Sequence, residues 1–131
     1  KAIKILLKQG YNLELKLIGA NYKPALKSIK SYIFQNNLEK FNKIFNQIDF
    51  KNIRKEYQKA NIQIAPSFCE SFGITVIESG NYSLPLICSN IKIFREITGN
   101  NTLLFNPTNE KDLAKKIKEM IENRFLRKKK N

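Results

Sequence analysis

Short apolar runs alternate with longer amphipathic stretches along the whole chain, and this alternation most restricts the possible folds. The apolar runs predict strands at Leu13–Ile18, Lys43–Ile48, Ile62–Pro66, Leu86–Ser89 and Thr102–Phe105. The amphipathic stretches predict helices at Ala2–Gln9, Pro24–Gln35, Phe50–Lys59, Phe72–Tyr82, Ile93–Ile97 and Glu110–Phe125. Such alternation is typical of βαβ units. The predicted fold class is therefore α/β, a Rossmann-like parallel sheet with helices on both faces. A regular doubly wound domain begins with a strand, so we expect its first strand to be missing here.

The length, the apolar content and the cysteines indicate the number of domains and exclude some classes of protein. A chain of 131 residues suits one domain, and we expect residues 1–131 to form a single domain that is truncated at its N-terminal end. No apolar run approaches the roughly 20 residues that span a bilayer. With no histidine, Cys69 and Cys88 are too few ligands for a structural zinc ion. We expect free thiols and a cytoplasmic location, with contact at the inner face of the membrane as a further expectation.

The formal net charge of +13 is the strongest anomaly of composition. A positive field attracts polyanions, which include nucleic acids, anionic lipid headgroups and sugar nucleotides. A simpler interpretation is a bias toward lysine and asparagine, with the lysines solvating the helix faces. Charge alone does not decide between these interpretations.

The segment from Ile62 to Ser89 holds the residues that point to chemistry. Glu70 lies just before the predicted helix, at the carboxyl end of the strand where open parallel sheets bind ligands, and Glu78 lies two turns into that helix. Gly73 has no Cβ, so a diphosphate or a sugar could approach its backbone closely. We expect the N–H groups of Phe72, Gly73 and Ile74 to be free first-turn donors that face an anion. Two glutamates eight positions apart are usually solvated surface, but a strand–turn–helix junction between them is far rarer.

The motif E-S-F-G-I-T-V-I-E resembles the signature of the retaining GT-B glycosyltransferases, in the C-terminal, donor-binding domain of the family 4-like group called glycosyl transferases group 1. The similarity continues with A-P-S before the motif and with S-L-P-L-I-C-S-N-I-K-I-F-R-E-I and L-L-F-N-P-T-N-E-K-D-L-A-K-K-I after it. Upstream, I-F-N-Q-I-D-F and L-K-L-I-G resemble two earlier strands of the family. The resemblance therefore covers nearly the whole chain, and the glutamate motif is its most specific part.

The resemblance implies a role for each residue of the motif. Glu78 would accept hydrogen bonds from the ribose hydroxyls of the donor, and Glu70, as the catalytic residue, would contact the hydroxyls of the transferred sugar. The main chain around Ile48 would contact the nucleotide base. The remaining residues implied in donor binding are Ser67, Ser71, Phe72, Gly73, Ile74 and Thr75.

The implied reaction is transfer of a hexose from a nucleoside diphosphate sugar, UDP- or GDP-hexose, with retention of anomeric configuration. The chain has no D-x-D motif, so we expect neither a metal ion nor a cofactor. The expected partners are the donor, an N-terminal acceptor domain that these residues do not contain, and an anionic membrane surface; no nucleic acid is expected. The family's diphosphate-binding Arg and Lys also lie outside these residues, so we expect the fragment alone to be inactive.

The chain departs from the family pattern at one position, and alternative functions remain open. The family usually has a glycine where this chain has Ser83, and we expect the serine to end the motif helix without left-handed geometry. Three alternatives remain open. They are a degenerate GT-B remnant that acts as a scaffold, a basic nucleic-acid-binding module whose affinity falls steeply with salt, and a GT-B epimerase.

Overall fold

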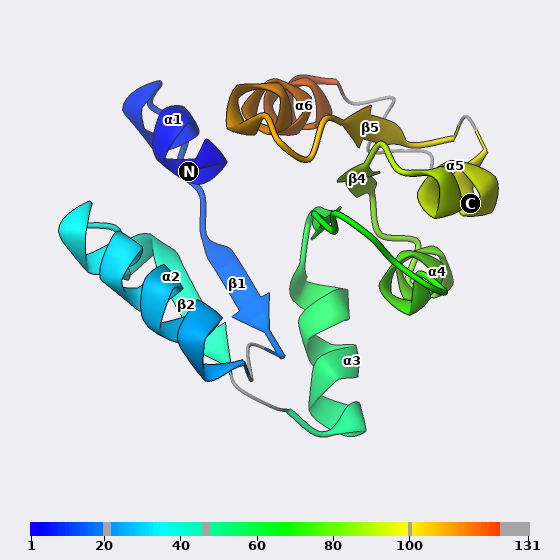
Figure 1. Ribbon diagram of the computed structural model, residues 1–131, viewed down its shortest axis with the longest axis horizontal. Helices are drawn as coiled ribbons and strands as arrows, with labels where there is room; N and C mark the ends of the chain where they lie inside the picture. The colour runs from blue at the N-terminus through cyan, green and yellow to red at the C-terminus, as the bar shows by residue number, and fades with distance from the viewer. Residues whose placement is uncertain (20–21, 46–47, 100, 124–131) are drawn as a thin grey trace. The chain divides into compact units, whose positions relative to one another are not determined.

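The computed structural model describes residues 1–19, 22–45, 48–99 and 101–123. The chain divides into two compact units, one of Lys1 and Ile3–Arg54 and the other of Ala2 and Lys55–Asn131. The division falls within helix α3 (Phe50–Lys59). Each unit contains a parallel sheet, which confirms the predicted α/β class with parallel strands and helices (Figure 1).

The first unit contains a pair of parallel strands, β1 (Leu15–Ile18) and β2 (Asn42–Phe45). Helix α1 (Ala2–Lys8) precedes β1, and helix α2 (Lys23–Gln35) connects the two strands, with a short 3₁₀ helix, η1 (Glu39–Phe41), before β2. A connection that contains a helix is what parallel strands require. The sequence did not predict η1. The predicted strand to Ile48 was too long, since Ile48 lies outside a strand, and residues 46–47 of that prediction lie outside the described residues.

The second unit contains three parallel strands in the order β3 (Gln63–Ala65), β4 (Leu86–Ser89) and β5 (Leu103–Phe105). Ile64 pairs with Ile87, and Cys88 pairs with Leu104. The central strand is buried from Ile87 to Ser89, as expected for a parallel strand covered on both faces. Helix α4 (Ile74–Asn81) connects β3 to β4, and helix α5 (Lys92–Thr98) connects β4 to β5.

The core that supports the motif is formed where β3, β4, α4 and α5 meet. Ala65, Val76, Cys88 and Phe94 are buried together there. The surrounding, partly buried apolar residues are Leu86, Ile91, Ile93, Ile97 and Leu104. This cluster fixes the position of α4 against the sheet, and therefore the position of the motif's second glutamate.

Helix α6 (Glu110–Glu122) closes the second unit. Ala114, Ile117 and Met120 are its buried residues, and their helical spacing explains why the sequence predicts it. The Asn109 side chain caps the helix by accepting hydrogen bonds from the N–H groups of Lys111 and Asp112. The predicted end at Phe125 lies outside the described residues. Among the helices that the structure describes, none is both long and apolar enough to cross a bilayer.

The end of α4 corrects one prediction. Ser83 adopts a positive φ of 49°, which is left-handed geometry that we did not expect of a serine. The Ser83 N–H donates to the carbonyl oxygen of Gly80 at 3.0 Å, and the Leu84 N–H donates to that of Ser79 at 2.9 Å. These two bonds form a Schellman motif, which places the residue after the C-cap in the left-handed region. The serine therefore takes the conformation that a glycine would take.

Candidate functional site

The motif loop occupies residues 66–73, between the carboxyl end of β3 and the first turn of α4. Because β3 and β4 are parallel, Ala65 and Ser89 end at the same edge of their sheet. This is the edge at which open parallel sheets bind ligands. Glu70 thus lies in the predicted setting, and Glu78 lies on α4, the helix that follows.

Gly73 is the N-cap of α4 and has a left-handed φ of 69°. A Cβ at this position would lie 2.7 Å from Ile97 Cδ1 and 3.3 Å from Phe94 Cε1. Both neighbours belong to α5. The glycine is therefore required by its backbone conformation and by the close approach of α5, in addition to any approach by a ligand.

The free donors of the helix lie further along the chain than predicted. Helix α4 begins at Ile74 and not at Phe72, because the left-handed Gly73 forms the cap. The N–H groups of Val76 and Ile77 already donate to the Gly73 carbonyl oxygen, at 2.9 and 3.2 Å. The N–H groups of Ile74 and Thr75 are therefore the first-turn donors without intrahelical acceptors. Phe72 lies outside the helix, so its predicted role as a first-turn donor is wrong.

Glu78 is half-buried, and its carboxylate already has a protein partner. The Tyr57 hydroxyl donates to Glu78 Oε2 at 2.7 Å, an ideal distance for such a bond. The ring of Tyr57 stacks on that of Tyr82, with centroids 4.8 Å apart and planes 10° from parallel. Burial, followed by the hydrogen bond and the charge of Glu78, raises the pKa of the Tyr57 hydroxyl. Tyr57 therefore remains a proton donor at physiological pH.

Glu70 is exposed, and its contact is local. Its Oε1 accepts a hydrogen bond from the N–H of Ser71 at 3.1 Å. The side chain is thus held near the start of the Ser71–Gly73 segment of the loop and leaves its second oxygen to solvent or to a ligand. Phe72 and Ile74, on either side of Gly73, are 66% and 60% exposed, so two large apolar side chains face solvent at the start of α4.

The segment between Lys59 and Lys92 carries a negative formal charge, whereas the whole chain is positive. No lysine or arginine occurs between Lys59 and Lys92, and Glu70 and Glu78 are the only charged residues in that stretch. A diphosphate at this loop would find main-chain N–H groups but no cation from the motif itself. The cations that the resemblance implies for a diphosphate are therefore not in this segment.

The other predicted residues are spread over the two units. Ser67 is half-buried in the motif loop, whereas the Thr75 residue is exposed and its carbonyl oxygen accepts a hydrogen bond from Gln63 Nε2 at 2.7 Å. Ile48 is half-buried after β2, in the first unit. Its role in base binding remains a prediction.

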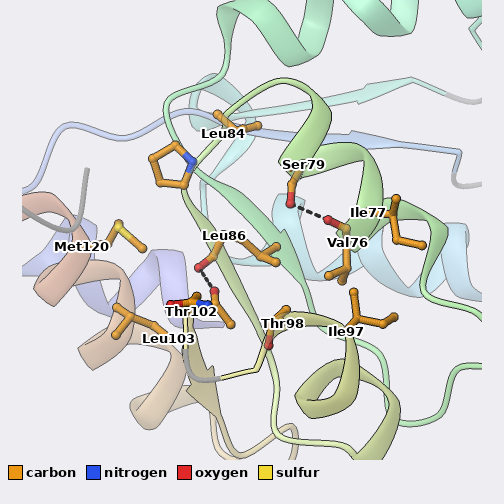
Figure 2. Close-up of a pocket in the computed structure, with 13 residues that line it drawn as sticks. Val76, Ile77, Ser79, Leu84, Leu86, Ile97, Thr98, Thr102, Leu103 and Met120 are labelled. Atoms are coloured by element: carbon orange, nitrogen blue, oxygen red, sulfur yellow. Dashed lines mark hydrogen bonds between the residues drawn. The ribbon is translucent and has the colours of Figure 1, made fainter. Parts of the chain in front are cut away.

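The second unit has a hollow of about 430 Å³ that the sequence did not predict. Figure 2 shows its lining, which comes from α4, the start of β4, α5, the start of β5 and α6. None of the predicted donor-binding residues lines it. Hydroxyl groups in the lining are used internally, since Ser79 donates to the Val76 carbonyl oxygen and Thr102 to that of Leu86. The hollow is thus largely apolar, and the motif contributes only Val76 and Ile77 to its lining.

Tyr57, Gln63 and Tyr82 were not predicted as site residues from the sequence. Tyr57 and Glu78 are 21 positions apart, and no local spacing connects them. Two tyrosines on either side of the motif helix gave no distinct signal, because tyrosine is common at half-buried positions.

Both cysteines are free, with Cys69 exposed and Cys88 buried. Within the described ranges, no three His, Cys, Asp or Glu side chains are placed to hold a metal ion.

Comparison with known proteins assigns the chain to a family. The family model described as glycosyl transferases group 1 matches residues 1–131. The chain belongs to this family. An uncharacterized glycosyltransferase of Methanocaldococcus jannaschii is 30% identical over 98% of this chain and 37% of its own length. An O-antigen chain mannosyltransferase of Salmonella typhimurium is 35% identical over 56% of this chain and 21% of its own length.

Solved structures show the same fold. The crystal structure of the C-terminal domain of a glycosyl transferase group 1 family protein from Francisella tularensis matches with a TM-score of 0.82 and 23% identity, over 98% of this chain and 69% of that one. A sucrose-phosphate synthase from Thermosynechococcus elongatus also matches with a TM-score of 0.82 and 23% identity, over 98% of this chain and 35% of that one. The chain spans 37% of the length of the first of the two relatives and 21% of the second, and it has the fold of group 1 glycosyltransferases.

Proposed function

We propose that this chain is the donor-binding part of a glycosyltransferase that takes a hexose from a nucleoside diphosphate sugar. The observation that carries the proposal is the strand–loop–helix arrangement of the motif in a chain of this family. Glu70 lies in the loop at the ligand-binding edge, and Glu78 lies on the helix that follows it. The relatives' names include glycosyltransferases and mannosyltransferases, which supports a hexose as the transferred group.

In this proposal Glu78 accepts hydrogen bonds from the ribose, and Glu70 accepts hydrogen bonds from hydroxyls of the hexose. The first-turn N–H groups of Ile74 and Thr75 face the diphosphate, because a helix amino end favours negative charge. During transfer the bond from C1 of the hexose to the diphosphate breaks, and a bond from C1 to an acceptor hydroxyl forms. The hydroxyl proton leaves with the diphosphate.

The finer features belong to the same proposal. The transfer retains anomeric configuration, proceeds without a metal ion or cofactor, and uses a UDP- or GDP-hexose. Stabilisation of the departing diphosphate is electrostatic, and its cations and the acceptor domain come from a longer chain. The net charge of +13 also suits contact with an anionic membrane surface from the cytoplasm.

The proposal is tested by titrating the isotope-labelled chain with UDP and with GDP and following its NMR spectrum. Glu78→Gln should weaken the binding of the better nucleotide by about 1.5–3 kcal/mol, the value of a hydrogen bond to a charged group. Glu96→Gln is the matched control, because Glu96 is an exposed carboxylate whose 3.9 Å pair with Lys92 contributes little.

Two results would contradict the proposal. In the first, neither nucleotide shifts resonances of the motif loop at millimolar concentration. In the second, Glu78→Gln and Glu96→Gln bind the nucleotide equally well. Either result would favour a scaffold that has lost donor binding.

A further inference from the structure

The contact between Tyr57 and Glu78 joins the part of α3 that belongs to the second unit to helix α4. Tyr57 lies near the end of α3, and Glu78 lies in the middle of α4. Their hydrogen bond of 2.7 Å links Oε2 of the carboxylate to a half-buried ring. Glu78 is the residue that the proposed function places on the ribose. Its contact with Tyr57 was not predicted from the sequence.

The Tyr57 ring is held on more than one side. Tyr82, the C-cap of α4, stacks on it. The same helix therefore carries both the acceptor of the Tyr57 hydroxyl and the ring that packs on Tyr57. The Gln63 side chain lies near enough to the Tyr57 hydroxyl to oppose the rise of its pKa without cancelling it. Gln63 in turn donates from Nε2 to the Thr75 carbonyl oxygen in the first turn of α4. The hydroxyl is therefore fixed in place by groups from β3 and α4.

A fixed donor has a definite effect on a glutamate. A free glutamate side chain has much rotamer entropy to lose when it binds a ligand. Ordering the side chain beforehand reduces that cost, which is the advantage of preorganisation. A carboxylate has about four acceptor positions. The tyrosine uses one of them on Oε2, so Oε1 remains open to accept hydrogen bonds.

We propose that Tyr57 is a positioning residue that orders the Glu78 carboxylate to accept both vicinal hydroxyls of a nucleotide ribose. The inference rests on the proposed function and adds a determinant of specificity to it. A site that hydrogen-bonds two hydroxyls rejects a ligand that lacks them, because its polar groups are then left unpaired. The arrangement therefore selects nucleotides with an intact ribose diol.

The test compares ribose nucleotides with their dideoxy forms. UDP, GDP and ADP are each titrated against the wild-type chain, and the one that binds best is then compared with its 2′,3′-dideoxy counterpart. Tyr57→Phe keeps the ring and its stack on Tyr82 and removes only the hydroxyl. It should weaken binding of the ribose nucleotide about threefold to tenfold and leave binding of the dideoxy nucleotide unchanged.

Tyr82→Phe is the matched control, since it removes one hydroxyl from the neighbouring ring of the same stack. It should leave the preference for ribose unchanged. Thermal melting of every variant checks that it is folded. In the double variant Tyr57→Phe with Glu78→Gln, the loss should equal that of Glu78→Gln alone, because the tyrosine acts through the glutamate.

Three results would overturn the positioning role. They are unchanged binding by Tyr57→Phe, tighter binding that reveals competition between the tyrosine and the ribose for Glu78, and an equal loss for the ribose and dideoxy nucleotides. If Glu78→Gln abolishes the ribose preference while Tyr57→Phe does not, only this inference fails. If the wild-type chain shows no ribose preference and Glu78→Gln has no effect, the proposed function fails as well.

Discussion

Gly73 faces Ile97 so closely that a Cβ on the glycine would lie 2.7 Å from Ile97 Cδ1. This contact joins the cap of the motif helix to α5, whose residue Phe94 is fully buried. The glycine of the motif is therefore part of the packing of the second unit. Its contribution to stability can be measured without any ligand.

Gly73→Ala should destabilise the fold by about 2–4 kcal/mol. A non-glycine residue with left-handed φ costs about 1–3 kcal/mol, and overpacking a core adds about as much. Ile97 can move the end of its side chain, but Phe94 is fully buried. The change is measured by urea unfolding followed by circular dichroism.

Gly80 provides the control on the same helix. It does not have a positive φ, and a Cβ there would meet nothing within 4 Å. Gly80→Ala should therefore stabilise the fold by about 0.5 kcal/mol, because alanine loses less entropy in a helix. Similar effects of the two alanine variants would show that the contact with α5 is unimportant.

Ser83→Gly should stabilise the chain by about 0.5–1 kcal/mol. Left-handed geometry costs an ordinary residue roughly 1–2 kcal/mol, and the greater freedom of glycine in the unfolded chain offsets part of this gain. Asn37, at the end of α2, has a φ of 53° and serves as the comparison. Asparagine adopts left-handed φ more readily than serine, so Asn37→Gly should gain less stability than Ser83→Gly. A loss of stability in Ser83→Gly would mean that the serine side chain contributes to the cap.

Elements with strong local signals were predicted well. The bounds of α3 and β4 agree with the prediction, because β4 is a short apolar run that Pro85 introduces and α3 has a clear amphipathic pattern. The strands and helices that the sequence proposed are present, and their errors lie at the ends. The family signature also identified the loop and helix that carry Glu70 and Glu78.

The remaining errors depend on contacts between segments distant in the sequence. The start of α4 at Ile74 follows from the left-handed Gly73, which α5 holds in place. The partner of Glu78 is a tyrosine on another helix, and only the folded chain brings the two together. The geometry of Ser83 was misjudged because propensity favours glycine there, whereas the Schellman hydrogen bonds determine the conformation.

Asn109→Ala should cost about 1 kcal/mol of stability. The Asn109 Oδ1 accepts hydrogen bonds from the N–H groups of Lys111 and Asp112, at 3.0 and 3.1 Å. Removing an N-cap side chain leaves these donors without their acceptor. Asn109→Asp is the control, since aspartate caps equally well and should retain stability in the same unfolding experiment. Equal stability of the alanine variant and the wild type would mean that solvent replaces the cap fully.

Cys88 should make stability fall at alkaline pH. Burial raises the pKa of its thiol to about 11, above the ordinary value of about 8.5. The folded chain therefore holds the proton more tightly than the unfolded chain does. This contribution to stability is complete below about pH 8.5 and is lost as the pH rises through about 11. Urea unfolding at pH 8 and pH 10.5 should show a smaller decrease for Cys88→Ala than for the wild type, whereas exposed Cys69→Ser should behave like the wild type. An equal decrease in all three would show that the buried thiol does not cause it.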